Sequence, residues 1–153
     1  MDEAALNSTF AAIEQAVSTV DIVVACAGFL PEVAPAAVAD SGDWWRAFEV
    51  NVRGLFLTFR AWMPHKSNNK PSFIYVNAGR SHCLRESMFA DLDLYSSAGA
   101  HFAPVPGLSG YSPSKTAAAN LIAHLQVENP TLHVTNFHPG ILETAVRSII
   151  FPF

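Results

Sequence analysis

The chain has 153 residues, of which 50% are hydrophobic and 14% are charged, and this composition excludes a disordered chain and allows one domain with a real core. The net charge of −4 excludes a strongly basic nucleic-acid surface, and no apolar run is long enough to span a bilayer. The two cysteines, Cys26 and Cys83, form no disulfide framework, and the acidic N-terminus lacks a signal-peptide pattern. We therefore expect a cytoplasmic protein with reduced thiols and with neither nucleic acid nor a membrane as a partner.

The first half of the sequence predicts two amphipathic helices, each followed by a strand. Residues 2–17 repeat apolar side chains every three or four positions, which places them on one helix face. Residues 20–25 form a short run rich in Val and Ile that ends at Ala27-Gly28, and this pattern predicts a buried strand. Residues 43–62 carry a second apolar helical stripe, and residues 73–76 predict a second buried strand.

The second half of the sequence predicts one more helix and one more strand. Ser112 is a candidate N-cap with Pro113 in the first turn, and the helix extends to about Glu128. Residues 132–137 predict a third strand, closed by Pro139-Gly140. The alternation of helix and strand predicts an α/β fold, a Rossmann-like parallel sheet with flanking helices in which about three strands are retained.

We expect residues 1–153 to form a single partial Rossmann-like domain that is interrupted once. Between Gly79 and Gly110 the sequence shows no steady hydrophobic period and is rich in glycine, serine and proline. Loops of this length are unusual inside a compact domain. Residues 80–105 are therefore expected to be an irregular insertion, and the sequence leaves open whether it is a true insertion or a translated intron.

Tyr111 and Lys115 lie four positions apart at the start of the predicted third helix, which places both side chains on one face. A neighbouring ammonium favours the phenolate and lowers the pKa of a tyrosine from its ordinary value of about 10. Such a pair can act as a general acid and base near neutral pH. For an isolated pair the alternative is a surface tyrosine beside a solvated lysine.

Three further features add to this candidate site. Asn51 lies on or beside the apolar stripe of the second helix, where its amide needs hydrogen-bond partners, so it is either a core residue bonded to backbone or a catalytic one. Ala27-Gly28 and Pro139-Gly140 follow strands at the carboxyl edge of the predicted parallel sheet, where ligands bind. Each is also compatible with an ordinary turn. Together with Tyr111 and Lys115, both turns would face one crevice.

Four segments resemble, in order and spacing, the central motifs of the short-chain dehydrogenase/reductase family: Asp21–Gly28, Trp45–Gly54, Tyr111–Lys115 and His138–Thr144. The Trp44-Trp45 pair and the run Leu125–Pro130 are most similar to fungal members. The resemblance covers most of the chain outside residues 80–105.

The resemblance implies an oxidoreductase that uses NADP or NAD, without a metal, to convert a small-molecule alcohol or carbonyl. It implies that Tyr111 exchanges the proton with the substrate, that Lys115 lowers the phenol pKa and binds the nicotinamide ribose, and that Asn51 orients a water. The cofactor-binding residues that it implies are Ala27, Gly28, Asn51, Tyr111, Lys115, Pro139, Gly140, Ile141 and Thr144.

The sequence departs from the family pattern at both ends and at two internal positions. The opening strand with its glycine-rich pyrophosphate turn and the closing elements are not found, so the chain resembles a member truncated at both ends. Ala78 stands where the family usually has Ser, and Cys26 replaces the usual Asn. These departures support an alternative function, a non-catalytic remnant or binding protein without cofactor affinity. Unpaired strand edges also predict homo-oligomers or aggregation.

Overall fold

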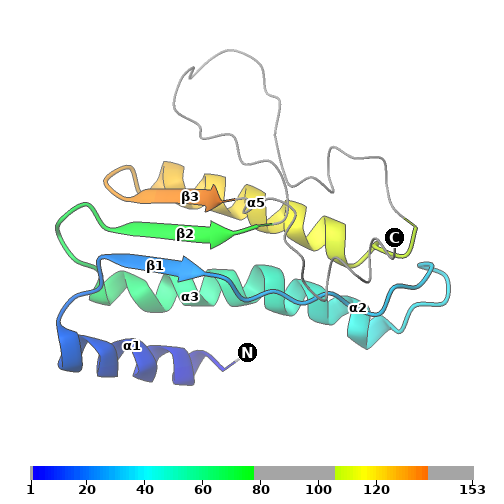
Figure 1. The fold of residues 1–153 in the computed structure, drawn as a ribbon, viewed down its shortest axis with the longest axis horizontal. Coiled ribbons are helices and arrows are strands. Elements are labelled where there is room, and N and C mark those ends of the chain that lie inside the picture. Colours follow the sequence, from blue (N-terminus) through cyan, green and yellow to red (C-terminus); the bar gives the residue numbers. More distant parts are fainter. Residues whose placement is uncertain (1, 78–105, 138–153) are drawn as a thin grey trace, which may run out of the picture.

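The computed structural model describes residues 2–77 and 106–137, which build a three-stranded parallel sheet with helices packed beside it (Figure 1). In chain order the elements are α1 (Glu3–Val17), β1 (Ile22–Ala25), α2 (Ser41–Phe48), the π-helix η1 (Glu49–Gly54), α3 (Leu55–Trp62), the 3₁₀ helix η2 (Met63–His65), β2 (Ser72–Val76), α5 (Tyr111–Glu128) and β3 (His133–Phe137). The strand order is β1-β2-β3. The predicted α/β class with a parallel sheet and flanking helices is confirmed. The predicted insertion at residues 80–105 lies outside the described residues.

The register of the sheet places the ends of all three strands at one edge. On the central strand β2, Tyr75 lies opposite Ala25 of β1 and opposite Asn136 of β3. Because the strands are parallel, the segments that follow β1 and β2 leave the sheet at the same edge, toward which all three arrows point in Figure 1. The segment Ala27-Gly28 is therefore at the carboxyl edge of the sheet, as the sequence predicted, and it forms part of an irregular loop.

The core lies between one face of the sheet and helices α3 and α5. Phe73 and Tyr75 of β2 and Val134 of β3 point into it and are almost fully buried. Trp62 and Phe59 of α3 complete the aromatic part, with the Phe59 and Phe73 ring centroids 5.2 Å apart in an edge contact. Aromatic side chains bury a large apolar area per residue, so these rings contribute to a hydrophobic core that also contains Leu55, Ile122 and Leu125.

The prediction of a buried first strand at residues 20–25 was wrong in part, because β1 is shorter (Ile22–Ala25) and one of its faces is exposed. Val23 and Ala25 pack against the core, but Ile22 and Val24 are 59% and 54% exposed. Successive side chains of a strand point to opposite faces of the sheet. In the described part of the chain the helices cover the face of β1 that carries Val23 and Ala25.

Two helix boundaries differ from the prediction. The second helix begins at Ser41 rather than Asp43, because Asp40 caps it by accepting a hydrogen bond from the Asp43 N–H at 2.8 Å. The third helix begins at Tyr111, and Ser112 does not cap it. The Ser112 N–H already donates to the Leu108 carbonyl at 3.0 Å, so this residue lies inside the first turn.

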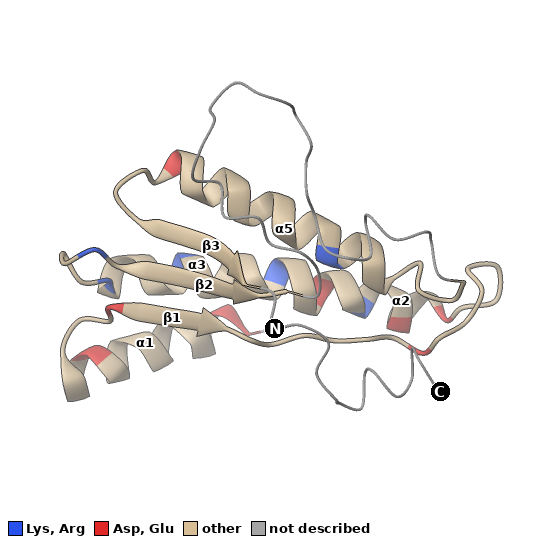
Figure 2. Cartoon of the chain, turned by 45° about the horizontal axis from the view of Figure 1, so that its top comes forward, with Lys and Arg blue, Asp and Glu red and all other residues tan. Residues whose placement is uncertain are grey.

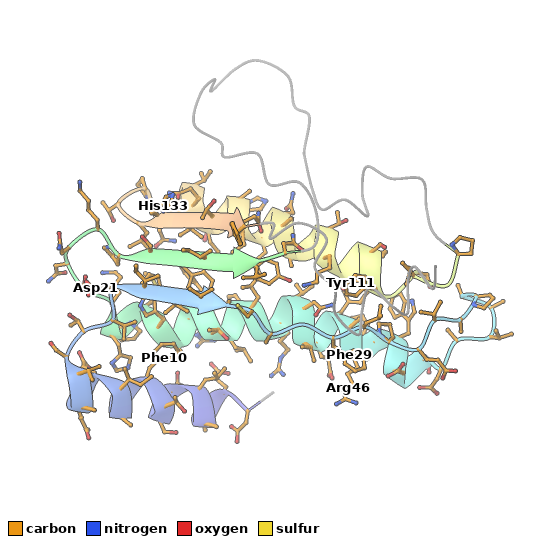
Figure 3. All side chains as sticks on the ribbon, viewed as in Figure 1. Phe10, Asp21, Phe29, Arg46, Tyr111 and His133 are labelled. Atoms are coloured by element: carbon orange, nitrogen blue, oxygen red, sulfur yellow. The ribbon has the colours of Figure 1, made fainter. Side chains whose placement is uncertain are left out.

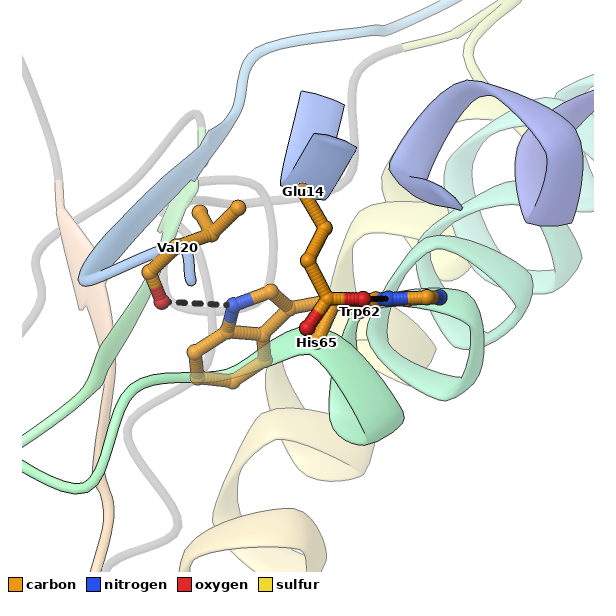
Figure 4. Close-up of polar contacts among 4 residues, drawn as sticks. All are labelled: Glu14, Val20, Trp62 and His65. Carbon is orange, nitrogen blue, oxygen red and sulfur yellow. Dashed lines mark hydrogen bonds and ion pairs between the residues drawn. The ribbon is translucent and has the colours of Figure 1, made fainter. Parts of the chain in front are cut away.

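Polar contacts join α1 and Val20, the residue before β1, to the end of α3 and to η2, and two of them are drawn in Figure 4. Glu14 of α1 lies 2.6 Å from Nδ1 of His65 in η2. The Trp62 indole N–H donates to the Val20 carbonyl at 3.2 Å, and the Val20 N–H donates to the His65 carbonyl at 2.9 Å. The N–H and the carbonyl of Val20 are therefore both hydrogen-bonded next to the buried Trp62 indole. These bonds fix the position of the chain just before β1.

Charged residues are sparse on the helix that carries the predicted Tyr-Lys pair. Lys115 is near the start of α5 and Glu128 at its end, and the helix has no other Lys, Arg, Asp or Glu (Figure 2). Between them α5 is mainly apolar and packs on β3 and η1. Within residues 2–77 and 106–137, no helix combines the length and the hydropathy needed to cross a bilayer.

Candidate active site

Lys115 is a buried lysine that contacts the central strand. Its side chain is 5% exposed, and its Nζ donates a hydrogen bond to the Tyr75 hydroxyl at 3.0 Å. Burial disfavours the charged form and lowers the pKa of Lys115 from its ordinary value to about 8. The alternative of a solvated surface lysine is therefore wrong, and this amine can change its charge close to neutral pH.

Tyr111 is half-buried at the first residue of α5 (Figure 3). The Lys115 Nζ lies 5.8 Å from the centre of the Tyr111 ring. Burial raises the pKa of Tyr111. The prediction that Lys115 lowers this pKa is wrong for this arrangement, since the burial of Tyr111 raises it and the Lys115 Nζ donates its hydrogen bond to Tyr75. In this state the Tyr111 phenol keeps its proton at neutral pH and can donate it.

Asn51 is fully buried in the π-helix η1 and joins two segments through its amide. Its Oδ1 accepts from the Phe29 N–H at 2.8 Å, and its Nδ2 donates to the Phe29 carbonyl at 2.9 Å and to Ser114 Oγ at 2.9 Å. π-Helical turns inside longer helices are frequent at functional sites. Asn51 therefore fixes the loop after β1 against α5. Of the two interpretations of Asn51 from the sequence, the core residue bonded to backbone matches these contacts.

The loop after β1 brings Gly28 next to the two polar residues. A Cβ atom at Gly28 would lie 3.4 Å from Lys115 Nζ and 3.7 Å from Asn51 Oδ1. Ala27 and Gly28 are exposed, whereas Lys115 and Asn51 are buried behind them. The Arg46 guanidinium lies 4.7 Å from the centre of the Phe29 ring and braces the same loop from α2 (Figure 3).

The structure thus brings Gly28, Asn51, Tyr111 and Lys115 together from three segments that are distant in the sequence. The other predicted cofactor-binding residues, Pro139, Gly140, Ile141 and Thr144, lie outside the described residues, as does Ala78. Their place beside the site stays a prediction. Among the described residues no cluster of three His, Cys, Asp or Glu side chains could hold a metal ion.

Two residues of this cluster were not identified by sequence reasoning. Tyr75 is 1% exposed on β2 and accepts the Lys115 hydrogen bond. The Ser114 Oγ accepts a hydrogen bond from the Asn51 Nδ2 and donates one to the Tyr111 carbonyl at 2.7 Å. A signal for Tyr75 was present, because a phenol inside an apolar central strand must find a partner for its hydroxyl. Ser114 gave no signal, since serine bonds to its own helix backbone in many proteins.

Loss of the Asn51 amide is expected to destabilise the fold. Asn51→Leu leaves the Phe29 N–H and carbonyl without their partner, and we expect a loss of about 1–3 kcal/mol in the free energy of unfolding. Urea unfolding followed by circular dichroism measures it. Asn68→Ala, at an exposed position, is the control and should change stability by less than ~0.5 kcal/mol. Equal midpoints for Asn51→Leu and wild type would show that the amide contacts are dispensable.

A parallel sheet with helices and a polar cluster at its carboxyl edge define the Rossmann-like class of α/β proteins. A family model described as enoyl-(acyl carrier protein) reductase matches residues 1–100. The chain belongs to the short-chain dehydrogenase/reductase family.

Two similar curated proteins come from fungi. The chain is 30% identical over 149 residues to the short chain dehydrogenase mpl6 of Monascus purpureus and 29% identical over 140 residues to the short chain dehydrogenase/reductase AacuD of Aspergillus aculeatus. These matches cover 96% and 90% of the chain, but only 44% and 42% of the relatives. The chain therefore spans less than half the length of these curated relatives.

Solved structures share the fold. A short chain dehydrogenase from Escherichia coli CFT073 complexed with NADPH has a TM-score of 0.78 at 22% identity and matches 99% of this chain and 56% of its own. An alcohol dehydrogenase from Thermococcus sibiricus complexed with 5-hydroxy-NADP has a TM-score of 0.67 at 20% identity, with coverages of 90% and 48%. At these identities the likeness concerns the fold.

Proposed function

We propose that this protein is an NAD(P)-dependent oxidoreductase that interconverts an alcohol and a carbonyl. The observation that carries the proposal is the meeting of Tyr111, Lys115 and Asn51 at the carboxyl edge of the sheet, behind the exposed Gly28. The structural relatives that contain NADPH or 5-hydroxy-NADP support a nicotinamide cofactor.

The residues present fit such a cofactor. The missing side chain of Gly28 leaves room next to Lys115 Nζ and Asn51 Oδ1, which a hydroxylated ligand can contact through hydrogen bonds. Lys115, Asn51 and Gly28 would hold the ribose and nicotinamide part of the cofactor. When bound, the cofactor supplies or accepts the hydride.

In the proposed reduction, Tyr111 donates its phenolic proton to the carbonyl oxygen of the substrate. The Lys115 ammonium, 5.8 Å from the Tyr111 ring, stabilises the phenolate that forms. Asn51 and Ser114 fix the start of α5, because Ser114 bonds both to the Asn51 amide and to the Tyr111 carbonyl. In the oxidation direction the same groups accept the proton.

A second candidate function is binding without catalysis. Ala78 stands at the position where the family usually has Ser, and alanine cannot donate a hydrogen bond to a substrate carbonyl. The proposed alternative is a member that lacks cofactor affinity and acts by contacts with other proteins.

Titration with NADPH and with NADH separates the two functions. Quenching of tryptophan fluorescence should give a dissociation constant on the order of 10–100 μM for NADPH, for NADH or for both. This lies within the range of typical Michaelis constants. Gly28→Val should weaken that binding by at least ~10-fold, because its side chain would occupy the space beside Lys115 and Asn51. Ala34→Val, elsewhere in the same loop, is the control. Absent or millimolar binding by the wild-type chain would favour the non-catalytic function.

A further inference from the structure

Two tyrosines, and not one, contact the candidate catalytic lysine. The Lys115 Nζ lies 3.0 Å from the Tyr75 hydroxyl, 5.0 Å from the centre of the Tyr75 ring and 5.8 Å from the centre of the Tyr111 ring. Tyr75 comes from the middle of the sheet, whereas Tyr111 is one helical turn before Lys115 on α5. The ammonium therefore lies between a phenol at the base of the site and a phenol at its edge.

Few other groups in the described residues can compensate the Lys115 charge. The ion pairs found there join Arg60 to Glu3 and His65 to Glu14, and neither involves Lys115. The titratable groups that face Lys115 in this region are Tyr75 from β2 and Tyr111 from α5. From η1 and the loop after β1 it is faced by the uncharged Asn51 and Gly28. The Tyr75 hydroxyl is thus the hydrogen-bond acceptor of this buried ammonium.

Packing alone does not explain a hydroxyl at position 75. Tyr75 is 1% exposed in the core cluster, opposite Ala25, and a phenylalanine would fill nearly the same volume there without burying a polar group. The hydroxyl is useful because a buried charge needs a hydrogen-bonded partner. Burial also raises the pKa of Tyr75, so it remains a neutral phenol and does not form an ion pair with the ammonium.

We infer that Tyr75 is a positioning residue. Its hydroxyl holds the Lys115 ammonium against the sheet, near the Tyr111 ring, and favours the charged form of the lysine. This inference deepens the proposed function, because Lys115 supplies the charge that stabilises the Tyr111 phenolate. In the present state the ammonium is bound to Tyr75, and Tyr111 keeps its proton. The hydroxyl of Tyr75 therefore sets both the place and the charge of the lysine.

The test measures the titration of Lys115 in the protein without cofactor. The sequence contains three lysines, Lys66, Lys70 and Lys115, so the side-chain NMR signals of labelled lysine can be assigned by single substitutions. In Tyr75→Phe, Lys115 should lose its proton about tenfold more readily than in the wild type, where its pKa is about 8. Lys66 and Lys70 serve as internal references.

Phe73→Leu is the matched control, because Phe73 is buried on the same face of β2 and its ring packs on Phe59 and Trp62. It should lower the melting temperature while leaving the Lys115 titration unchanged. An unchanged Lys115 titration in folded Tyr75→Phe would overturn the inference. So would a shift of equal size in Phe73→Leu, because the effect would then come from packing.

A second measurement needs no variant. Nuclear Overhauser contacts in the wild-type protein should connect the Lys115 side chain with the Tyr75 ring protons, and contacts with the Tyr111 ring alone would overturn the inference. Both experiments are made without cofactor. Failure of NADPH and NADH to bind would thus overturn the proposed function only, and an unperturbed lysine would overturn the role of Tyr75 only.

Discussion

Tyr111→Phe is expected to lower kcat/KM for the reduction of a carbonyl substrate by ~10²–10⁴-fold, the usual contribution of a positioned general acid. The substitution removes only the hydroxyl that would donate the proton, and the ring at the start of α5 remains. Initial rates with NADPH or NADH and a panel of ketones and aldehydes measure the effect. The affinity for the cofactor should change little.

Thr116→Val is the control for this substitution, because it removes a hydroxyl from the same helix that donates only to the Ser112 carbonyl at 3.1 Å. If Tyr111→Phe retains the wild-type rate, Tyr111 is not the proton donor.

The pH profile gives an independent check on the same site. Lys115 is charged below its pKa of about 8 and neutral above it, so the stabilisation of the Tyr111 phenolate is present at lower pH and lost as the pH rises through about 8. The rate of reduction should fall over that range. A rate that is constant from pH 7 to about 9.5 would contradict a role for the charged amine.

Trp62→Ala is expected to destabilise the fold by about 3–5 kcal/mol, the usual result of truncating a buried tryptophan. Trp62 is fully buried, its ring centroid lies 5.6 Å from that of Phe73, and its indole N–H satisfies the Val20 carbonyl before β1 (Figure 4). The substitution therefore creates a cavity and removes a hydrogen bond at once. Chemical unfolding followed by far-ultraviolet circular dichroism measures the loss.

Trp45→Ala is the matched control, since Trp45 is 55% exposed and stacks on its helix neighbours Trp44 and Phe48. Its effect should stay below ~1 kcal/mol. Similar losses for both tryptophans would show that the α3 face is not the centre of the core.

The sequence by itself determined the order of helices and strands, the parallel sheet and the family. Hydrophobic period distinguishes helix from strand, and the Tyr111–Lys115 spacing places two side chains on one helix face whatever surrounds them. The sequence also pointed to Asn51 and Gly28, because a polar amide in an apolar stripe and a glycine after a buried strand are local signals.

Only the tertiary structure decided what these side chains contact. The partner of Lys115 is Tyr75, 40 positions earlier on another element, and that contact depends on how α5 packs over the central strand. The same packing buries Lys115 and Tyr111 and so sets the direction of both pKa shifts, against the lowering that spacing alone suggested for the phenol. The exposure of Ile22 and Val24 was also decided there, since a strand sequence does not state which of its faces a helix will cover. Local pattern fixes the elements, whereas burial and hydrogen-bond partners follow from their packing.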